Sequence, residues 1–281
     1  MMTIPKHNPL CTFTTLCVAL WLAVANTALG QDTAVVVQTP ITTTARMVGI
    51  GAGNLLDTYL SPQEYSGTEL RYIANTRRRR PERMWGSQHE LQAIVAHAGT
   101  QARGATEIEG ILSYSYGLYR HFWLVPRRLW IHAGAQAEAL GGFLYNTLGG
   151  NNPAQARLSI NIGPTAAMGY NFHLLGRPMT ASCELKADIA GLMFSPYYTQ
   201  SYYEIFSLGN YHHNIIPTTP FSAPSLSHQI HLDIKLGRGQ LRLGYLGQYR
   251  SAKVNQLKSH AYSHLLLIGY VKTFKTTLFT P

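Results

Sequence analysis

Two segments of the chain alternate small or apolar residues with charged ones in a strict period of two. The first runs from Ala181 to Ile189 as ASCELKADI, and the second from Ile230 to Leu236 as IHLDIKL. Because successive side chains of a β-strand point to opposite faces, each segment predicts a strand with one apolar and one charged face. Such a strand is stable only where one face meets an apolar environment and the other a polar one. Together with an export signal, the pattern favours strands that separate lipid from a polar lumen.

The N-terminus is organised like a secretory signal peptide. Lys6 and His7 precede an apolar run from Leu16 to Ala25, and the small residues of Ala28-Leu29-Gly30 supply a cleavage site. A membrane anchor is the rival interpretation, but the run is shorter than the roughly 20 apolar residues of a spanning helix. We predict a cleaved signal peptide over 1–30, a periplasmic lead over 31–44 and a barrel domain over 45–281.

Export leaves the chain with a single cysteine. Cleavage removes two of the three cysteines and leaves Cys183, so no disulfide can form within the mature chain. No other apolar run approaches the length of a spanning helix, so membrane insertion would have to use strands, whose backbone groups must all be paired. We therefore expect the outer membrane as the location and its lipid as a partner.

Ten segments follow a strand period, and the connections between them alternate in length. Long connections are predicted at 57–67, 98–105, 141–156, 195–225 and 251–262, short ones at 125–128, 174–177 and 237–239, and an intermediate one at 78–86. Outer-membrane barrels have short periplasmic turns and longer external loops, so the sequence predicts an all-β fold, an antiparallel up-and-down transmembrane β-barrel of about ten strands. Residues 200–208 would raise the count to twelve strands if they form a further hairpin.

A soluble barrel of the lipocalin type would show the same alternation with its faces inverted. The alanine-rich face of 129–140, the alternating connections and the aromatic residues near segment ends favour lipid outside. Amphipathic rings prefer the headgroup level, so we predict that these aromatic residues form membrane girdles. They are Tyr59, Tyr119, Phe122, Trp123, Trp130, Phe143, Tyr145, Tyr197, Tyr198 and Tyr270.

The formal net charge is +10, and the run Arg77–Arg80 is the most basic segment. Such a run is a candidate patch for nucleic acid. An exported chain rarely meets nucleic acid, however, and no stacking aromatic residues accompany the run. We interpret it as a solvated turn and expect no nucleic-acid partner.

Charged residues of both signs fall on the faces predicted to line the lumen. Because an unpaired buried charge is costly, we predict that they pair into a salt-bridge network that plugs the barrel, with a substrate path as the alternative. Within it, Glu184, Lys186, Asp188, Asp233 and Lys235 are predicted to form one antiparallel charge ladder. The predicted inward set is Glu69, Arg71, Glu90, Glu107, Glu109, Glu138, Glu184, Lys186, Asp188, Asp233, Lys235 and Arg242.

The longest predicted connection, 195–225, is rich in aromatic residues. A long loop in a compact domain is usually functional or disordered. We predict that this loop contacts a glycan or protein partner, with a lid over the barrel mouth as the alternative. The contact residues we expect are Tyr197, Tyr198, Tyr202, Tyr203, Phe206 and Tyr211.

No residue spacing matches a catalytic or metal-binding signature. His97 and Asp57 lie at predicted loop bases, where a histidine near a carboxylate could act as a general base, and His212-His213 lie in the long loop. Adjacent histidines in a loop lack the fixed geometry of a metal site. We predict no catalytic residue, metal or cofactor. A structural or surface-interaction barrel is the preferred function, a narrow selective channel the second and a rim hydrolase the third.

Three stretches resemble a known family. They are Met47–Gly51, Asn54–Pro62 with Tyr65–Arg71, and Gly191–Tyr198 with the tyrosine-rich loop after it. They resemble exported proteins of Bacteroidota grouped as domain of unknown function 3316, over about residues 44–274. The resemblance implies an outer-membrane β-barrel. Its motifs are strand and loop signatures, so it assigns no catalytic residue to any position.

Overall fold

The structure is a computed structural model that describes residues 40–100, 104–150 and 152–275. The predicted signal peptide and most of the predicted lead lie outside these residues. Within the part that is described, no helix has both the length and the apolar character needed to cross a membrane.

Strands make up most of the described chain. In order they are β1 (Ile41–Asp57), β2 (Ser61–Arg79), β3 (Trp85–Gly99), β4 (Thr106–Val125), β5 (Leu129–Asn146), β6 (Ala154–Leu174), β7 (Arg177–Ala187), β8 (Ala190–Phe194), β9 (Ile215–Thr218), β10 (Ser225–Leu236), β11 (Gly239–Val254) and β12 (Leu257–Lys275), with the short helix α2 (Tyr202–Phe206) before β9.

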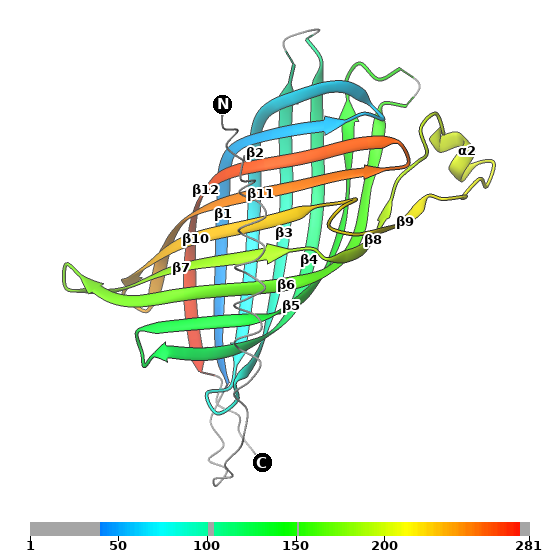
Figure 1. Ribbon diagram of the computed structural model, residues 1–281. Coiled ribbons are helices and arrows are strands. Elements are labelled where there is room, and N and C mark those ends of the chain that lie inside the picture. The colour runs from blue at the N-terminus through cyan, green and yellow to red at the C-terminus, as the bar shows by residue number, and fades with distance from the viewer. Residues whose placement is uncertain (1–39, 101–103, 151, 276–281) are drawn as a thin grey trace, which may run out of the picture. The chain divides into compact units, whose positions relative to one another are not determined.

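Ten of these strands close into an antiparallel ring (Figure 1). The order is β1-β2-β3-β4-β5-β6-β7-β10-β11-β12, and β12 pairs back with β1, with Val48 opposite both Tyr72 and Ile268. β8 pairs with β6 beyond the end of β7, and β9 pairs with β8. The predicted up-and-down barrel is confirmed, with ten wall strands and two additional short ones.

The two faces of the wall have opposite character. Outward side chains are apolar, as at Leu112, which is 56% exposed, whereas inward ones are polar, as at Arg71, which is 1% exposed. A soluble barrel would bury the apolar face and expose the charges. The lipocalin-type alternative is therefore wrong, and the fold is that of a transmembrane barrel with lipid outside.

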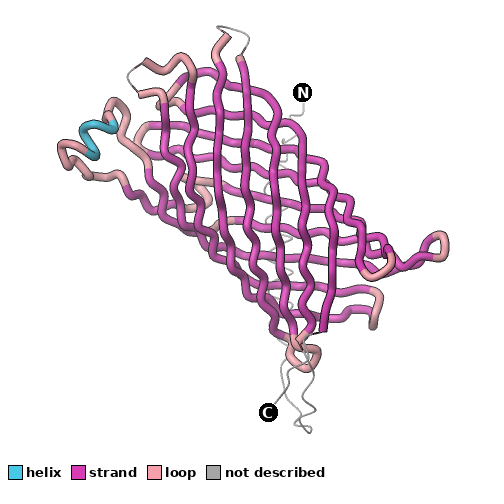
Figure 2. Tube along the Cα trace, turned by 180° about the vertical axis from the view of Figure 1, so that it is seen from behind, coloured by secondary structure: helices cyan, strands magenta, loops and turns pink. Residues whose placement is uncertain are grey.

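The strands are longer and two connections shorter than the sequence suggested. The β1–β2 connection is only Thr58–Leu60, where we predicted a loop over 57–67, and the β11–β12 connection is the Asn255-Gln256 turn, where we predicted 251–262. Polar residues such as those in 61–66 do not end a strand that continues above the membrane, because ladder hydrogen bonds still form in water. We call the end of the barrel that carries the β1–β2 and β11–β12 connections the rim, and the opposite end the base. Figure 2 shows the strands continuing to the rim.

The arginine run is not a solvated turn as predicted. β2 continues through Arg79, and Arg77 faces the lumen, where its guanidinium pairs with Glu184. An arginine is stable at an inward-facing strand position when a carboxylate accepts hydrogen bonds from its guanidinium. Only Arg80 of the run lies outside the strand.

The predicted aromatic girdle is partly wrong. Phe143, Tyr145 and Tyr270 are exposed on the outer face. Tyr119 is buried inside the barrel and stacks on His132, which also packs on Trp130, both at a ring-centroid distance of 4.4 Å. Position in a strand period, and not nearness to a strand end, decides which face a ring occupies.

Glycine on the inner face of β1 permits close strand approach. A Cβ built on Gly51 would lie 2.0 Å from the carbonyl oxygen of His264 on β12. At Gly49 a Cβ would meet the Leu267 side chain at 2.5 Å. The glycines thus make room for the neighbouring strand.

Candidate functional site

Ion pairs cross the lumen between opposite walls. Lys186 on β7 reaches Glu90 on β3, with Nζ 2.6 Å from Oε1, and Arg77 on β2 pairs with Glu184 on β7. In the ring of ten, β7 lies four places from β3 and five from β2, so these bonds join facing walls. Gln88 donates to Glu184 at 2.9 Å and completes the cluster.

Two further pairs cross nearer the rim. Arg157 on β6 lies opposite Asp57 on β1, with Nη1 3.2 Å from Oδ2, and Arg250 on β11 pairs with Glu138 on β5. Each pair again joins strands four or five places apart in the ring. Crossing pairs at several levels tie the two halves of the wall together.

Arg71 has the most complete hydrogen bonding in the lumen. Its Nε donates to Glu69 at 2.7 Å, its Nη1 to Gln248 at 2.7 Å and Gln92 at 3.1 Å, and its Nη2 to Ser263 at 3.2 Å. Burial of a guanidinium is tolerated when its donors are satisfied in this way. Arg71 is therefore a structural junction between the strands β2, β3, β11 and β12.

The predicted charge ladder between β7 and β10 does not form. The register places Glu184 opposite Gln229, and Lys186 opposite Ser227. Asp233 instead receives two hydrogen bonds from Arg242, at 2.6 and 2.7 Å. The charges of β7 find their partners across the lumen because their neighbours on β10 are uncharged.

The twelve residues predicted to face the lumen differ in burial. Asp188 is half-buried and bonds to Ser225, and Lys235 is exposed at the base end of β10. The other ten are buried on the inner face: Glu69, Arg71, Glu90, Glu107, Glu109, Glu138, Glu184, Lys186, Asp233 and Arg242. Sequence reasoning missed Arg77, Arg157 and Arg250 as members of this network, although the strand period places all three on the inner face.

Two buried apolar clusters lie on the inner face beside the charged residues. The first belongs to β1, β2, β11 and β12 and comprises Ala45, Met47, Ile73, Leu246, Leu265, Leu267 and Val271. The second lies nearer the rim and comprises Leu55, Tyr65, Ala96, Ala98, Ala105 and Leu144, against which Leu60 and Ala261 pack. Together with the crossing ion pairs, these clusters fill space in the lumen.

The rim carries a folded loop with the short helix α2 between β8 and β9. Ser201 caps the helix: its Oγ accepts from the Glu204 backbone nitrogen at 3.2 Å, and Glu204 accepts from the Ser201 nitrogen at 2.7 Å. The proposed extra hairpin over 200–208 is therefore wrong. The Ser-x-x-Glu capping box was the sequence signal for a helix.

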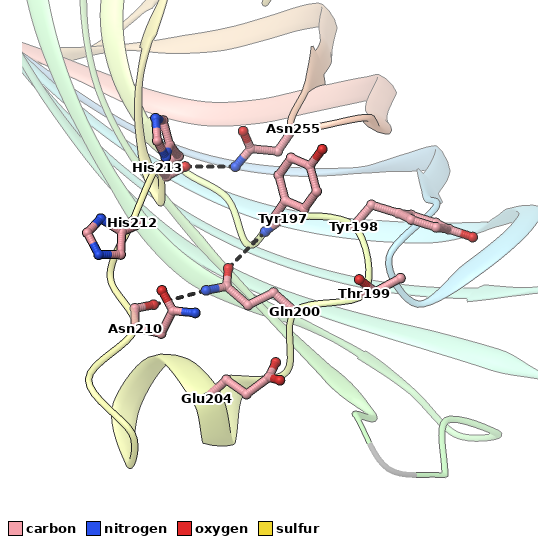
Figure 3. A pocket seen from close by; sticks show the side chains of 9 residues that line it. All are labelled: Tyr197, Tyr198, Thr199, Gln200, Glu204, Asn210, His212, His213 and Asn255. Atoms are coloured by element: carbon pink, nitrogen blue, oxygen red, sulfur yellow. Dashed lines mark hydrogen bonds between the residues drawn. The ribbon is translucent and has the colours of Figure 1, made fainter.

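A pocket of about 500 Å³ lies beside this helix (Figure 3). Gln200 organises it by accepting from the Tyr197 backbone nitrogen at 3.0 Å and from Asn214 Nδ2 at 2.7 Å, while its Nε2 donates to the Asn210 carbonyl at 2.9 Å. The lining residues are Tyr197, Tyr198, Thr199, Gln200, Glu204, Asn210, His212, His213 and Asn255. We call this the rim pocket.

Asn255 fastens both ends of the loop to the barrel. From the β11–β12 turn, its Nδ2 donates to the carbonyls of Ser195 at 3.0 Å and His213 at 2.8 Å. Its φ of +49° is in the left-handed region, which asparagine tolerates better than most residues. Sequence reasoning missed Asn255 because it lay in the predicted long connection over 251–262.

Two residues of the rim pocket hold strained backbone. Thr199 has φ +78° and His213 has φ +59°. Positive φ is costly for a β-branched residue, and such strain persists only where surrounding bonds impose it. The loop is thus a preorganised structure and not a pliant tether.

The six predicted loop aromatics have different roles. Tyr197 and Tyr198 line the rim pocket, and Tyr203, Phe206 and Tyr211 are exposed outside it. Tyr202 is instead half-buried: its hydroxyl donates to Gln155 at 2.8 Å and accepts from the Ala156 nitrogen at 2.7 Å.

Two neutral phenols dock the loop. Tyr59, in the β1–β2 turn, donates its hydroxyl to the Gln200 carbonyl at 3.0 Å and meets the Tyr202 ring edge-on. Burial raises the pKa of Tyr59 and that of Tyr202 to about 12. Both therefore remain protonated and able to donate at neutral pH.

The residues considered for catalysis do not form a site together. His97 is exposed on the outer face of β3, whereas Asp57 is buried on the inner face of β1. His212 and His213 both line the rim pocket. Among the residues whose placement is described, no group of histidine, cysteine and acidic side chains could hold a metal ion.

A family model described as "Protein of unknown function (DUF3316)" matches residues 13–279. No curated protein matches the chain in sequence.

The chain is also similar to several solved structures. One is the transport unit of the autotransporter AIDA-I from Escherichia coli, with 9% identity, a TM-score of 0.45, and coverage of 92% of this chain and 97% of that one. The outer membrane protease OmpT from Escherichia coli has 7% identity and a TM-score of 0.44, covering 87% and 99%. An outer membrane channel from Pseudomonas putida F1 has 8% identity and a TM-score of 0.33, covering 89% and 100%. No function is transferred at this level of similarity.

Proposed function

The chain belongs to the DUF3316 family, and from its own geometry we propose that it is an exported outer-membrane barrel that binds a glycan in its rim pocket. The observation that carries the proposal is the preorganised pocket of about 500 Å³ at the rim. Small-molecule sites are typically concave, largely preformed and equipped with a few fixed polar groups.

The lining favours a sugar over an apolar ligand. The carboxylate of Glu204 and the amide of Asn210 provide acceptors and donors for hydroxyl groups, and the rings of Tyr197 and Tyr198 provide faces for the apolar side of a pyranose. The pocket lies in the loop between β8 and β9, outside the barrel wall. A ligand at the cell surface would reach it without entering the lumen.

The lumen supports a surface role over a channel. The four crossing ion pairs would have to separate to open a wide continuous path through the lumen. A narrow selective channel remains the second proposal, and its test is electrical.

Two tyrosines of the loop provide a matched test. Tyr198 lines the rim pocket and is 53% exposed, whereas Tyr203 is 66% exposed and does not line it. The purified protein is applied to an array of bacterial and host oligosaccharides. We expect at least one to bind, Tyr198→Ala to weaken that binding by about tenfold or more, and Tyr203→Ala to leave it unchanged. An array without binders, or equal losses in both variants, would contradict the proposal.

A further inference from the structure

The barrel wall is interrupted between β7 and β10. The β7–β10 ladder ends where Ala187 faces Leu226, and pairing resumes between β8 and β9 where Gly191 faces Thr218. Three residues, 188–190, connect the ladders on one side, and six, 219–224, connect β9 to β10 on the other. We call these two connecting segments the seam.

The backbone on each side of the seam is bonded away from it, although a side-chain hydrogen bond between Asp188 and Ser225 crosses it. The Ile189 nitrogen donates to the Ile162 carbonyl of β6 at 2.9 Å. On the other side, Ser251 and Lys253 of β11 donate to the carbonyls of Pro224 at 3.0 Å and Ser222 at 2.8 Å. One segment of the seam therefore pairs with β6 and the other with β11. The backbone ladder that joins β7 to β10 does not extend across the seam.

The outer surface of the seam is apolar. Phe221 in the seam is 97% exposed, and Ile162, Ile189, Leu192 and Leu226, in the seam or on the strands that flank it, are exposed too. On a transmembrane barrel, exposed apolar side chains face lipid. The interruption therefore opens toward the hydrocarbon phase and not toward water.

A cavity of about 110 Å³ lies behind the seam. Asp188, Ala223 and Pro224 line it from the seam, and Arg71, Arg157 and Arg250 line it from the lumen. A cavity of this size suits a polar head group and not a whole lipid.

Arg157 has donors to spare in this cavity. It is 9% exposed, and its Nε and Nη2, which are buried beneath the cavity lining, have no hydrogen-bond partner, so a head group would reach them by displacing neighbouring side chains. Only Nη1 approaches Asp57, and Glu109 lies 4.0 Å from Nε, beyond hydrogen-bond distance. Arg71 is saturated by its neighbours, so the unpaired fork of Arg157 is the group left to bind a carboxylate or phosphate.

We propose that the seam is a side entrance through which the anionic head of a single-chain amphipath leaves the lipid and binds Arg157. The carboxylate or phosphate oxygens accept from Nε and Nη2, while the tail stays against the apolar residues of the seam. This binding is separate from the rim pocket and does not require passage through the lumen.

Equilibrium dialysis of the full chain in non-ionic detergent tests the site. The probes are radiolabelled dodecanoate, acetate as the free anion, and dodecanol as the uncharged tail. The variants are Arg157→Gln, Arg157→Lys and the matched control Arg238→Gln, an exposed arginine in the β10–β11 turn. Heat-dependent migration on an SDS gel verifies folding of each.

We expect dodecanoate to bind the parent chain, with affinity reduced about tenfold or more in Arg157→Gln, less in Arg157→Lys and not in Arg238→Gln. Acetate and dodecanol should bind at least tenfold more weakly than dodecanoate, because each lacks one half of the ligand. Equal dodecanoate affinity in Arg157→Gln and the parent would overturn the head-group site. If acetate bound as tightly as dodecanoate, the requirement for an apolar tail would be wrong. If dodecanol bound as tightly as dodecanoate, the requirement for an anionic head would be wrong.

The entrance has its own test if Arg157→Gln fails to fold. Ala223→Leu places bulk where the seam meets the cavity, and Ala135→Leu, on the exposed face of β5, is the control. Dodecanoate association should slow severalfold in Ala223→Leu only. An unchanged rate in a folded Ala223→Leu variant would contradict entry through the seam.

Discussion

Lys186 offers the sharpest test of the lumen network. Its ammonium is buried, 2.6 Å from Glu90 and 3.6 Å from Glu184, and it links β7 to β3 across the barrel. Lys186→Met keeps a similar side-chain volume and removes the charge. The substitution leaves two buried carboxylates with one cation fewer between them.

The expected cost follows from what each carboxylate retains. Removing one partner of a buried ion pair typically costs about 3–5 kcal/mol. Glu90 keeps hydrogen bonds from Asn75 and Gln92, both at 2.7 Å, and Glu184 keeps Arg77. We therefore expect the lower end, about 3 kcal/mol of unfolding free energy.

The assay is equilibrium unfolding in urea, in detergent micelles, followed by tryptophan fluorescence. Lys235→Met is the control, because Lys235 lies on the same face but is exposed, and it should cost no more than about 0.5 kcal/mol. In a double variant, Glu90→Gln should recover part of the loss caused by Lys186→Met, since it removes the stranded charge. Equal stability of Lys186→Met and Lys235→Met would refute the reasoning.

Three further predictions concern the backbone and the rim. Gly51→Ala should prevent barrel folding, because its Cβ would lie 2.0 Å from a backbone carbonyl, whereas at Gly53, where the nearest atom is 3.6 Å away, alanine should fold; gel mobility before and after heating distinguishes them. Asn255→Ala should leave the barrel intact and make the loop protease-sensitive, and equal cleavage rates with the parent would contradict its clamping role. Because burial raises the pKa of Tyr59 from 10.0 to about 12, its contribution to loop docking should be complete below pH 10 and lost as the pH rises through 12. In the parent chain, protease cleavage of the loop should therefore increase as the pH rises through 12. In Tyr59→Phe the increase should be smaller, because the ionising hydroxyl is absent; the same pH profile in both proteins would contradict the prediction.

The sequence allowed the wall and its faces to be predicted because strand geometry is local. Alternation in 181–189 and 230–236 identified β7 and β10 and the correct inner face of each. The same period assigned Glu69, Arg71 and Glu109 to the lumen, where they are buried. Alternation with a period of two can be recognised within one segment, without knowing which strand lies beside it.

Partners across the lumen could not be predicted in the same way. Whether Lys186 meets Asp233 or Glu90 depends on register and strand stagger, which the closed ring fixes as a whole. The predicted ladder assumed pairing with the adjacent strand. The register places uncharged residues of β10 opposite the charged residues of β7. The charged side chains of β7 therefore pair with residues on the facing wall.

The rim and the seam illustrate two kinds of missed signal. The capping box of Ser201 and Glu204 was readable and would have replaced the proposed hairpin with a helix. The seam, by contrast, arises because 219–224 bonds to β11 while 188–190 follows β6. Nothing in either segment alone indicates that the ladder between them lapses.

Single-channel recording in a planar lipid bilayer tests the closed lumen most directly. With the pairs of Lys186, Arg77, Arg157 and Arg250 intact, the refolded parent chain should insert and show no discrete conductance steps. Steady steps from the parent, altered in size or ion selectivity by Glu184→Gln, would contradict a lumen closed by these pairs and would make the barrel a channel.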